Sequence, residues 1–468
     1  MKITQIYTGC LSQGAYYIES KGEVAIIDPL REVQPYIDTA KKDGASIKYV
    51  FETHFHADFV SGHVTLAEKT GANIVFGPTA APSFKAHIAQ DNEVFTLGEI
   101  TLTLLHTPGH TLESSTILLK DAHGKDHAIF SGDTLFLGDV GRPDLAQKST
   151  LSLSDLAGML FDSLRNKIMP LADDVLVYPA HGAGSSCGKN LSTATVDTLG
   201  HQKKTNYALR ASMSKQEFID EVTTGLLPPP AYFPLNVQLN KEGYQPIETV
   251  LQQGTQALSV ADFETKALET GAIILDVRHQ SLFLKGHVPN AIFIGIDGGF
   301  APWVGALLKD ITQPILLIAP KDTEAAVVTR LARVGFDNVL GFLAGGFDAW
   351  RAAGKEVATI SSVSAAVLAE KMPENALVFD VRKPGEYTNE HLVGVPNTPL
   401  DYLHNHFNDF PRETPFYVHC AGGYRSVIAA SILKARGFHQ VIDVAGGYRE
   451  IKQTQIPRTA TACPSTLT

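Results

Sequence analysis

Short apolar runs alternate with Gly-rich turns over the first 200 residues. The pattern predicts buried strands at residues 24–28, 49–51, 128–130 and 175–178, and a hairpin over 95–105 with its turn at 97–99. Residues 153–169 have helical spacing, with Ser152 or Ser154 as the N-cap and Pro170 beyond the end. Polar side chains follow several of these strands directly. Layered α/β folds carry their functional residues at strand ends, so we expect a site there.

Residues 203–256 differ in composition from the part before them. Three consecutive prolines stand at 228–230, and a polar stretch runs from Asn236 to Gly254. Because proline-rich and polar segments favour extended linkers, we expect an extended connector between domains here.

An internal repeat occupies residues 257–468. The triplet Asp-Val-Arg at 276–278 recurs at 380–382, and in each copy a histidine follows the aspartate by eleven positions. An Ala-Gly-Gly triplet also recurs, at 344–346 and 445–447. The period of about 100 residues suits two duplicated α/β domains, since solenoid repeats are only about 20–50 residues long.

The length of 468 residues fits about three domains at roughly 100–200 residues each. Combined with the repeat, it predicts domains at residues 1–250, 257–357 and 358–468. An apolar fraction of 44% allows each domain to bury its own core.

Charge and cysteine content narrow the class of protein. The formal net charge is −10 and no run of Lys or Arg occurs, which argues against nucleic acid or an anionic membrane as the main partner. We see no signal peptide at the start, and no apolar run approaches the ~20 residues of a membrane span. The four scattered cysteines, Cys10, Cys187, Cys420 and Cys463, indicate reactive thiols in a reducing cytoplasm rather than a disulfide framework.

Histidine and aspartate side chains gather just after the predicted strands. Residues 53–59 read Thr-His-Phe-His-Ala-Asp-Phe, which places three potential metal ligands on one tight loop. Further residues of this kind follow the later strands. Imidazole and carboxylate groups are typical ligands of first-row metals, so the set indicates a metal site. Its members are His54, His56, Asp58, His110, Asp133 and His181.

This set resembles the metallo-β-lactamase superfamily, whose motif is HxHxDH followed by His, Asp and His at later strand ends. The resemblance covers about residues 1–250 and implies an αβ/βα sandwich with the metal at one edge of two packed sheets. One position departs from the motif. Phe59 stands where the last His of HxHxDH serves the second metal of the dinuclear hydrolases. We therefore expect a second hydrolytic metal to bind poorly, and the sequence is more similar to the mononuclear iron branch, the persulfide dioxygenases.

Resemblance to the persulfide dioxygenases implies one Fe(II) per chain, held by His54, His110 and Asp133. Two histidines and one carboxylate on one face of the ion leave three positions open, which suits an iron that must bind both substrate and dioxygen. Zinc prefers a tetrahedral site with one open position and carries out no redox step.

Five further residues are predicted to serve the same site. His56, Asp58 and His181 then contact the metal ligands or bind water. Arg142 follows the predicted iron-binding Asp by nine residues, in a Gly-Arg segment similar to one in the family. Two roles are open for Arg142. It either forms a salt bridge within its loop, or it places a positive charge near the site that orients the metal ligands or an anionic substrate. Cys187, six residues past His181 in a Gly/Ser loop, is interpreted as a substrate-pocket thiol rather than an inert buried cysteine.

A second candidate site lies near the end of the chain. Residues 415–426 predict a strand, a Gly-rich loop and a helix start, with Cys420 first in the loop and Arg425 last. Backbone N–H groups of such a loop and the helix N-terminus point at one place and stabilise an anionic sulfur there. The residues between them, predicted to form the substrate-binding loop, are Ala421, Gly422, Gly423 and Tyr424.

This segment, with Asp-Val-Arg before it and Gly-Gly after it, resembles the rhodanese sulfurtransferases, whose cysteine accepts a sulfane sulfur and becomes a persulfide. The first repeat departs from the pattern. Ala319 aligns with Cys420, the loop is one residue shorter and lacks the Gly pair, and Leu282 stands where the second copy has Glu386. We therefore expect residues 257–357 to be a rhodanese fold without catalytic activity.

Together the resemblances imply an α/β multidomain enzyme in which a persulfide dioxygenase precedes a silent and an active rhodanese domain. Such an enzyme oxidises a low-molecular-weight thiol persulfide, of glutathione, coenzyme A or a similar carrier, with dioxygen to thiol and sulfite. Cys420 then exchanges sulfane sulfur among persulfide, sulfite and thiosulfate. We also expect a cytoplasmic homo-oligomer that acts in sulfide detoxification.

Two other classes of protein stay open. A zinc thioester hydrolase of the glyoxalase II kind would use the same fold, and Phe59 speaks against it. A non-catalytic sulfur carrier or interaction protein would explain the silent repeat. The complete ligand set of His54, His110 and Asp133 speaks against that alternative.

Overall fold

The computed structural model describes residues 1–146, 151–189, 191–372 and 375–460. The chain divides into two compact units: Met1–Ile247 with Ala332–Gly335, and Glu248–Leu331 with Phe336–Thr468. Cys463, which the sequence left without a role, lies outside the described residues. Within those residues, no helix combines the length and apolar character needed to cross a bilayer.

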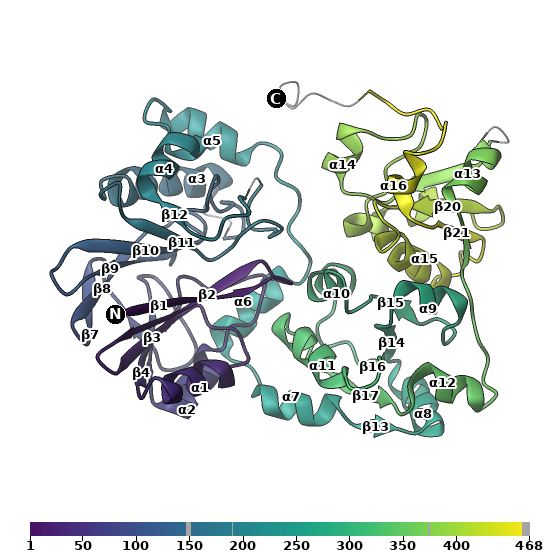
Figure 1. Cartoon of the computed structure of the whole chain (residues 1–468), viewed down its shortest axis with the longest axis horizontal. Coiled ribbons are helices and arrows are strands. Elements are labelled where there is room, and N and C mark those ends of the chain that lie inside the picture. Colours follow the sequence, from purple (N-terminus) through teal and green to yellow (C-terminus); the bar gives the residue numbers. More distant parts are fainter. Residues whose placement is uncertain (147–150, 190, 373–374, 461–468) are drawn as a thin grey trace. The chain divides into compact units, whose positions relative to one another are not determined.

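The first unit is an αβ/βα sandwich in which two mixed sheets pack face to face (Figure 1). The first sheet, in spatial order, contains β1 (Lys2–Thr8), β2 (Gln13–Ser20), β3 (Glu23–Ile27), β4 (Ser46–Phe51), β5 (Asn73–Phe76) and β6 (His87–Ile88). The second contains β12 (Asp197–Thr198), β11 (Leu176–Pro179), β10 (Asp126–Gly132), β9 (Ser115–Lys120), β8 (Ile100–His106) and β7 (Glu93–Leu97). This architecture confirms the predicted fold class.

Helices cover the outer face of each sheet. Helices α1 (Gln34–Lys42) and α2 (His63–Thr70) share a core with the first sheet. Helices α3 (Leu153–Ser163) and α5 (Lys215–Thr223) share another with the second, while α4 (Leu199–Thr205) follows β12. Since both faces of the sheets are covered, their strands appear in the sequence as continuous apolar runs.

Strand β2 shows how the alternation of side chains builds these layers. Tyr16 and Ile18 point into the core between the sheets, and Ala15 and Tyr17 point toward the helices. The predicted strands and the hairpin are confirmed as β3, β4, β10, β11 and the β7–β8 pair. The helix predicted over 153–169 is α3 followed by a π-helical turn, and its N-cap is Ser152, which forms a capping box.

The prediction of an extended connector over 203–256 was wrong, because this segment is largely helical. It contains α5, α6 (Phe233–Glu242) and α7 (Ile247–Gly254). Residues that favour helix starts prevail over the polar, proline-rich composition. Ser214 and Glu217 form a reciprocal capping box at the start of α5. Helix α6 has a proline in its first turn, where no backbone N–H is needed. The three prolines themselves lie outside these helices.

The second unit contains two parallel sheets flanked by helices (Figure 1). The first, in spatial order, is β13 (Ala257–Leu258), β17 (Val339–Leu343), β16 (Ile315–Ile318), β14 (Ile273–Asp276) and β15 (Ile292–Phe293), with α8 (Val260–Thr270), α9 (Gln280–Lys285), α10 (Phe300–Leu307), α11 (Glu324–Arg333) and α12 (Gly346–Ala352). The second is β18 (Ser361–Val363), β21 (Val441–Val444), β20 (Phe416–His419) and β19 (Leu377–Asp380), with α13 (Ala365–Lys371), α14 (Pro384–Asn389), α15 (Arg425–Ala435) and α16 (Gly447–Ile451). The sequence repeat therefore corresponds to two α/β layers of the same kind.

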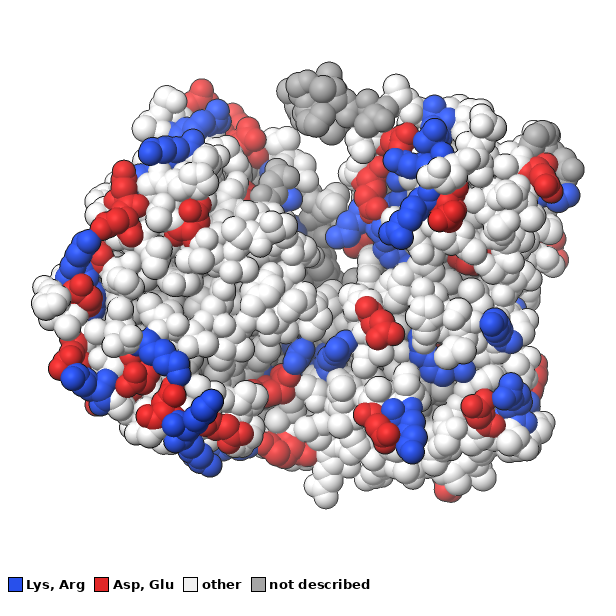
Figure 2. Space-filling view, viewed as in Figure 1, with Lys and Arg blue, Asp and Glu red and all other residues white. Residues whose placement is uncertain are grey.

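Charged side chains of both signs are interspersed over the face of the molecule shown in Figure 2. Lys and Arg do not gather into one broad basic patch on that face, and the whole chain carries a formal net charge of −10. On this face the charges lack the single-sign pattern that a nucleic-acid surface needs.

Candidate metal centre and cysteine loop

The strand ends of the first unit bring three potential metal ligands together. His54 follows β4, His110 follows β8 and Asp133 follows β10. His54 Nε2 lies 3.9 Å and His110 Nε2 lies 3.4 Å from Asp133 Oδ2. All three side chains are buried, and their ligand atoms lie within 4.8 Å of one another. The structure thus assembles the set that the sequence predicted as iron ligands.

Hydrogen bonds on the far side of each imidazole fix which nitrogen faces the centre. The backbone carbonyl of Arg142 accepts from His110 Nδ1 at 2.8 Å. The Thr53 hydroxyl donates to Asp28 Oδ2 at 2.8 Å, so its oxygen is free to accept from His54 Nδ1 at 3.0 Å. Both histidines are therefore held in the tautomer that leaves Nε2 as a lone-pair donor, as metal-binding histidines require.

The two carboxylate oxygens of Asp133 have different surroundings. Its Oδ1 accepts from His181 Nδ1 at 2.7 Å, whereas its buried Oδ2 has no hydrogen-bond partner among the described residues. Burial acts to raise the pKa of Asp133, but His181, His110 and His54 together outweigh it and lower that pKa, so the group stays ionised. A buried anionic oxygen facing two imidazole nitrogens fits a cation, and two histidines with one carboxylate are the residue types of a facial triad.

The structure also assembles a donor set that the sequence did not group. Asp58, His181 and Cys187 are buried, with ligand atoms within 4.8 Å of one another. His181 Nε2 lies 2.8 Å from Asp58 Oδ2. Burial, followed by the charges of Asp58 and Asp133, raises the pKa of the Cys187 thiol. This set lies beside the predicted iron ligands and could hold a second cation.

His56 contacts the predicted ligand His54, with ring centroids 4.2 Å apart, while its Nε2 faces two buried carboxylates. Its Nε2 lies 3.1 Å from Asp28 Oδ1 and 3.4 Å from Glu52 Oε2. Burial opposes the charge of the imidazolium, yet Asp28 and Glu52 prevail and raise the pKa of His56 to about 10. The Phe59 ring packs on the imidazole with centroids 4.3 Å apart. His56 therefore belongs to an ion network beneath the ligand loop.

Sequence reasoning missed two residues that hold this loop. Asn240 Nδ2 donates to the carbonyls of His56 and Phe59 at 2.8 Å each, and its Oδ1 accepts from Ser61 N. The Tyr232 hydroxyl donates to the Asp58 carbonyl at 3.3 Å. Both residues belong to the segment that was predicted to be a connector. The signal available was a buried polar residue in an amphipathic helix, but helix α6 itself had not been predicted.

Arg142 forms the loop salt bridge that was one of the two roles considered for it. Its guanidinium binds both carboxylate oxygens of Asp144 at 2.6 Å and donates to the Leu227 carbonyl at 2.6 Å. Its backbone carbonyl orients His110, and its backbone N–H donates to the Cys187 carbonyl at 3.0 Å. Arg142 thus ties the loop that carries Cys187 to a predicted iron ligand.

The cysteine loop of the second unit surrounds a buried thiol. Gly423 N donates to Cys420 Sγ at 3.1 Å, and Tyr448 N donates to the Cys420 carbonyl at 2.6 Å. The guanidinium of Arg425 binds the Glu386 carboxylate through two hydrogen bonds of 2.5 and 2.8 Å. The loop thus presents backbone N–H to the sulfur and holds a cation at the start of α15, as an anionic sulfur site needs.

Tyr424 anchors this loop to the first of the two repeated domains. Its hydroxyl donates to the Gly295 carbonyl at 2.6 Å, and its ring meets Phe293 edge to face. A Cβ added at Gly298 would lie 2.3 Å from the ring, so only glycine leaves room for Tyr424 there. The side chain of Tyr424 therefore packs in the neighbouring domain.

Comparison with known families agrees with this geometry. Residues 8–181 match the metallo-beta-lactamase superfamily, and residues 260–353 and 364–454 match the rhodanese-like domain. A solved structure described as a metallo-beta-lactamase from Staphylococcus aureus is 32% identical, with a TM-score of 0.65, and the match covers 74% of this chain and 99% of that one.

Two curated relatives match the first unit. The mitochondrial persulfide dioxygenase ETHE1 of Homo sapiens is 29% identical over 221 residues, which are 47% of this chain and 78% of that protein. A hydroxyacylglutathione hydrolase of Tolumonas auensis is 33% identical over 170 residues, 36% of this chain, and this chain spans 60% of the hydrolase's length. With the convergent ligands and the repeated α/β layers, these matches show that the chain belongs to the metallo-beta-lactamase superfamily and carries two rhodanese-like domains after its metallo-beta-lactamase domain.

Proposed function

We propose that this chain is a non-haem Fe(II) persulfide dioxygenase coupled to a rhodanese sulfurtransferase. The observation that carries the proposal is the convergence of His54 Nε2, His110 Nε2 and Asp133 Oδ2 at one buried point. Similarity to the human persulfide dioxygenase and the presence of two rhodanese-like domains support it. In the overall reaction, one thiol persulfide, one dioxygen and one water give one thiol, one sulfite and two protons.

The residues around the centre prepare it for this reaction. His54, His110 and Asp133 would hold one Fe(II) ion per chain, which would supply the redox chemistry for adding dioxygen to sulfur. The Arg142 carbonyl and Thr53 keep the two Nε2 atoms available, and His181 engages Asp133 Oδ1 so that Oδ2 stays free. Cys187 lies beside His181 as a thiol of the proposed substrate pocket.

The second reaction is a sulfur exchange at Cys420. The Cys420 thiolate attacks the outer sulfur of thiosulfate, the S–S bond of thiosulfate breaks, and sulfite leaves with the electron pair. Cys420 is then a persulfide, which returns its outer sulfur to sulfite or to a thiolate by the reverse step. The Gly423 N–H and the N-terminus of α15 stabilise the anionic sulfur in both states. Free thiols of this kind fit a cytoplasmic location, and self-association stays a prediction.

The test joins metal analysis to oxygen consumption on anaerobically purified protein. We expect one iron per chain and oxygen uptake that depends on glutathione persulfide or coenzyme A persulfide. Asp133→Asn should remove both iron and uptake, whereas Asp126→Asn, at the start of the strand that Asp133 follows, should change neither. Iron-loaded protein that consumes no oxygen with either persulfide would contradict the proposal.

A zinc thioester hydrolase is the second candidate, favoured by the donor set of Asp58, His181 and Cys187 and by the hydroxyacylglutathione hydrolase relative. If the protein is such a hydrolase, it should bind two zinc ions per chain and hydrolyse S-lactoylglutathione. Cys187→Ser should then lower the zinc content from two toward one, because a hydroxyl is a poorer zinc ligand than a thiolate. An unchanged metal content in this variant would count against the second candidate.

A further inference from the structure

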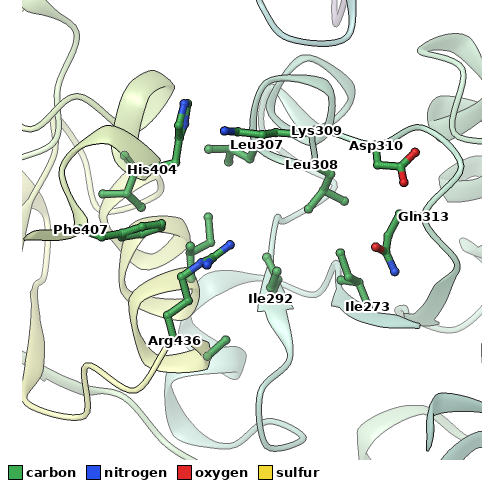
Figure 3. Close-up of a pocket in the computed structure, with 13 residues that line it drawn as sticks. Ile273, Ile292, Leu307, Leu308, Lys309, Asp310, Gln313, His404, Phe407 and Arg436 are labelled. Carbon is green, nitrogen blue, oxygen red and sulfur yellow. The ribbon is translucent and has the colours of Figure 1, made fainter. Parts of the chain in front are cut away.

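A cavity of about 730 Å³ lies within the second unit, where the two rhodanese-like domains meet (Figure 3). Its first-domain wall includes Ile292 of β15 and Leu307 at the end of α10, and its second-domain wall includes Phe407 and Ile432. Helix α15 carries the cysteine loop at its other end, about 15 Å along the axis at 1.5 Å per residue over its 11 residues. The cavity is thus separate from the sulfur site.

The floor of the cavity is apolar and only partly covered. Ile273, Ile292, Leu307 and Phe407 are half-buried, and Ile432 is buried. The floor continues an interface that the chain closes with a hydrogen bond from Phe293 N to Ser431 Oγ of 3.0 Å. A volume of this size, with aliphatic and aromatic walls, is typical of a pocket for a small molecule.

Cationic side chains border this apolar floor. Lys309, His404 and Arg436 all line the cavity, and Figure 3 shows the nitrogen ends of Lys309 and Arg436 near its open space. Within the described ranges, none of the three has a carboxylate oxygen within the 4.0 Å of an ion pair, and Arg436 lies over the Phe407 ring at 4.7 Å. Burial, followed by the charges of Lys309, His406 and Arg436, lowers the pKa of His404, so His404 adds no charge at neutral pH, where Lys309 and Arg436 stay cationic.

One acidic side chain also lines the cavity and limits its charge. The Asp310 carboxylate accepts from the backbone and the hydroxyl of Thr312 at 2.8 and 2.7 Å. Two permanent cations near an acid that is already hydrogen-bonded leave an excess of about one positive charge. An anion with a single charge balances this excess, whereas a nucleotide or another polyanion does not.

We propose that this cavity binds a small amphiphilic monoanion, a medium-length hydrocarbon that ends in a carboxylate. The hydrocarbon replaces water over the isoleucine, leucine and phenylalanine side chains, and the carboxylate pairs with Lys309 and Arg436 at the rim. Because both domains contribute walls, such a ligand links them at the end of α15 opposite to the cysteine loop. The proposal rests on the cavity alone and stands whether or not the sulfur chemistry is as proposed above.

The test uses decanoate as the probe, titrated calorimetrically into the full-length protein below its micellar concentration. Decyltrimethylammonium, with the same hydrocarbon and the opposite charge, is the ligand control. We expect decanoate to bind with about one site per chain and the cation at least about tenfold more weakly, since the rim charges then repel the head group. Failure of decanoate to bind at millimolar concentration, or equal binding of the two ligands, overturns the proposal.

Two arginines that share a local geometry supply a matched pair of variants. Arg436 lies over Phe407 at 4.7 Å and lines the cavity, and Arg412 lies over Phe438 at 4.5 Å and does not line it. Arg436→Glu should weaken decanoate binding at least about tenfold, and Arg412→Glu should leave it within about twofold. Equal affinities in the two variants contradict the site.

A further variant removes the space rather than the charge. Ala435→Phe places a ring in the cavity from the last residue of α15 and should abolish decanoate binding. Retention of wild-type sulfur transfer shows that the variant is folded. Undiminished decanoate binding in the folded variant overturns the assignment, and if the variant does not fold, the arginine pair decides.

Discussion

The two rhodanese-like domains repeat the same framework contacts, and the loop that carries Cys420 in the second is built differently in the first. In each, the arginine of the repeated Asp-Val-Arg pairs with its own aspartate at 2.6 Å and lies over an aromatic ring, Phe347 in the first domain and Tyr448 in the second. The repeated histidines stack on Phe283 and Tyr387, with ring centroids 3.9 and 3.7 Å apart. The repeated residues thus hold the fold in both copies, including the copy that lacks the cysteine.

The loops that follow the matching strands are built differently. After β20, Gly423 N reaches the sulfur of Cys420. After β16, the backbone N–H and the hydroxyl of Thr323 both donate to the Pro320 carbonyl, so this loop closes on itself. Leu282, at the position of the arginine-binding glutamate, is exposed. The contacts that hold the fold are therefore independent of the loop that carries the reactive thiol. Each variant below changes one of these and not the other.

The largest effect is expected from removing the thiol. Cys420→Ser should lower sulfur transfer from thiosulfate to cyanide by about 10³-fold or more, because a hydroxyl is a far weaker nucleophile and cannot carry a persulfide. Persulfide-dependent oxygen uptake should be retained, since the proposed metal ligands lie in the first unit. Substantial transfer by Cys420→Ser would assign the sulfur carrier to another thiol.

A matched pair of glycines comes next. Gly447 and Gly346 have φ of +58° and +59°, so alanine strains both backbones alike. A Cβ at Gly447 would lie 2.3 Å from the Cys420 carbonyl oxygen, whereas at Gly346 the nearest atom, the Ala319 oxygen, is 3.6 Å away. Gly447→Ala should therefore lower sulfur transfer by about tenfold or more and destabilise the unit by about 1–3 kcal/mol beyond Gly346→Ala. Sulfur-transfer rates and urea unfolding are measured for both variants. Equal losses of rate and stability in the two would refute this prediction.

A smaller effect is expected at Arg425. Arg425→Gln removes the cation that binds Glu386 and faces the anionic donor. We expect the KM for thiosulfate to rise about tenfold, with a smaller change in kcat. Arg425→Lys should raise KM less, because lysine keeps the positive charge but cannot form the two parallel hydrogen bonds of a guanidinium. Steady-state kinetics of the two variants tests this. A fall in kcat alone would place the arginine in the chemical step instead.

The smallest effect, none at all, is expected from adding a thiol to the first repeat. Ala319→Cys in a Cys420→Ser background should not restore sulfur transfer, because the loop after β16 directs its donors to the Pro320 carbonyl. The measurement is the same transfer assay. Appreciable activity would mean that the cysteine by itself distinguishes the two domains.

Local sequence order explains which parts of the site could be predicted. His54, His110 and Asp133 were among six candidates at predicted strand ends, and resemblance to the persulfide dioxygenases selected these three as ligands. Cys420 was found because a strand, a Gly-rich loop and a helix are contiguous. The helices of 203–256 were not predicted, because their apolar faces are short and their polar residues suggested a linker.

Contacts between distant segments required the tertiary structure. Asn240 reaches the carbonyls of His56 and Phe59 across more than 180 residues of chain. Cys187 joins Asp58 and His181 in a buried group that the sequence analysis did not bring together. Tyr424, predicted in a substrate loop, anchors in the neighbouring domain. No spacing along the chain encodes these pairings, since they depend on how the loops pack.

The sequence by itself determined the fold class, the duplicated domains and the identity of the candidate ligands and thiols. These follow from periodicity, from motifs whose members are near neighbours along the chain or stand at strand ends, and from the family resemblances that those motifs carry. The tertiary structure decided which imidazole nitrogens face the centre, which carboxylate oxygen stays free, and which side chains turn away into separate networks. Those choices depend on burial and on hydrogen bonds between remote segments, which exist only once the layers have packed.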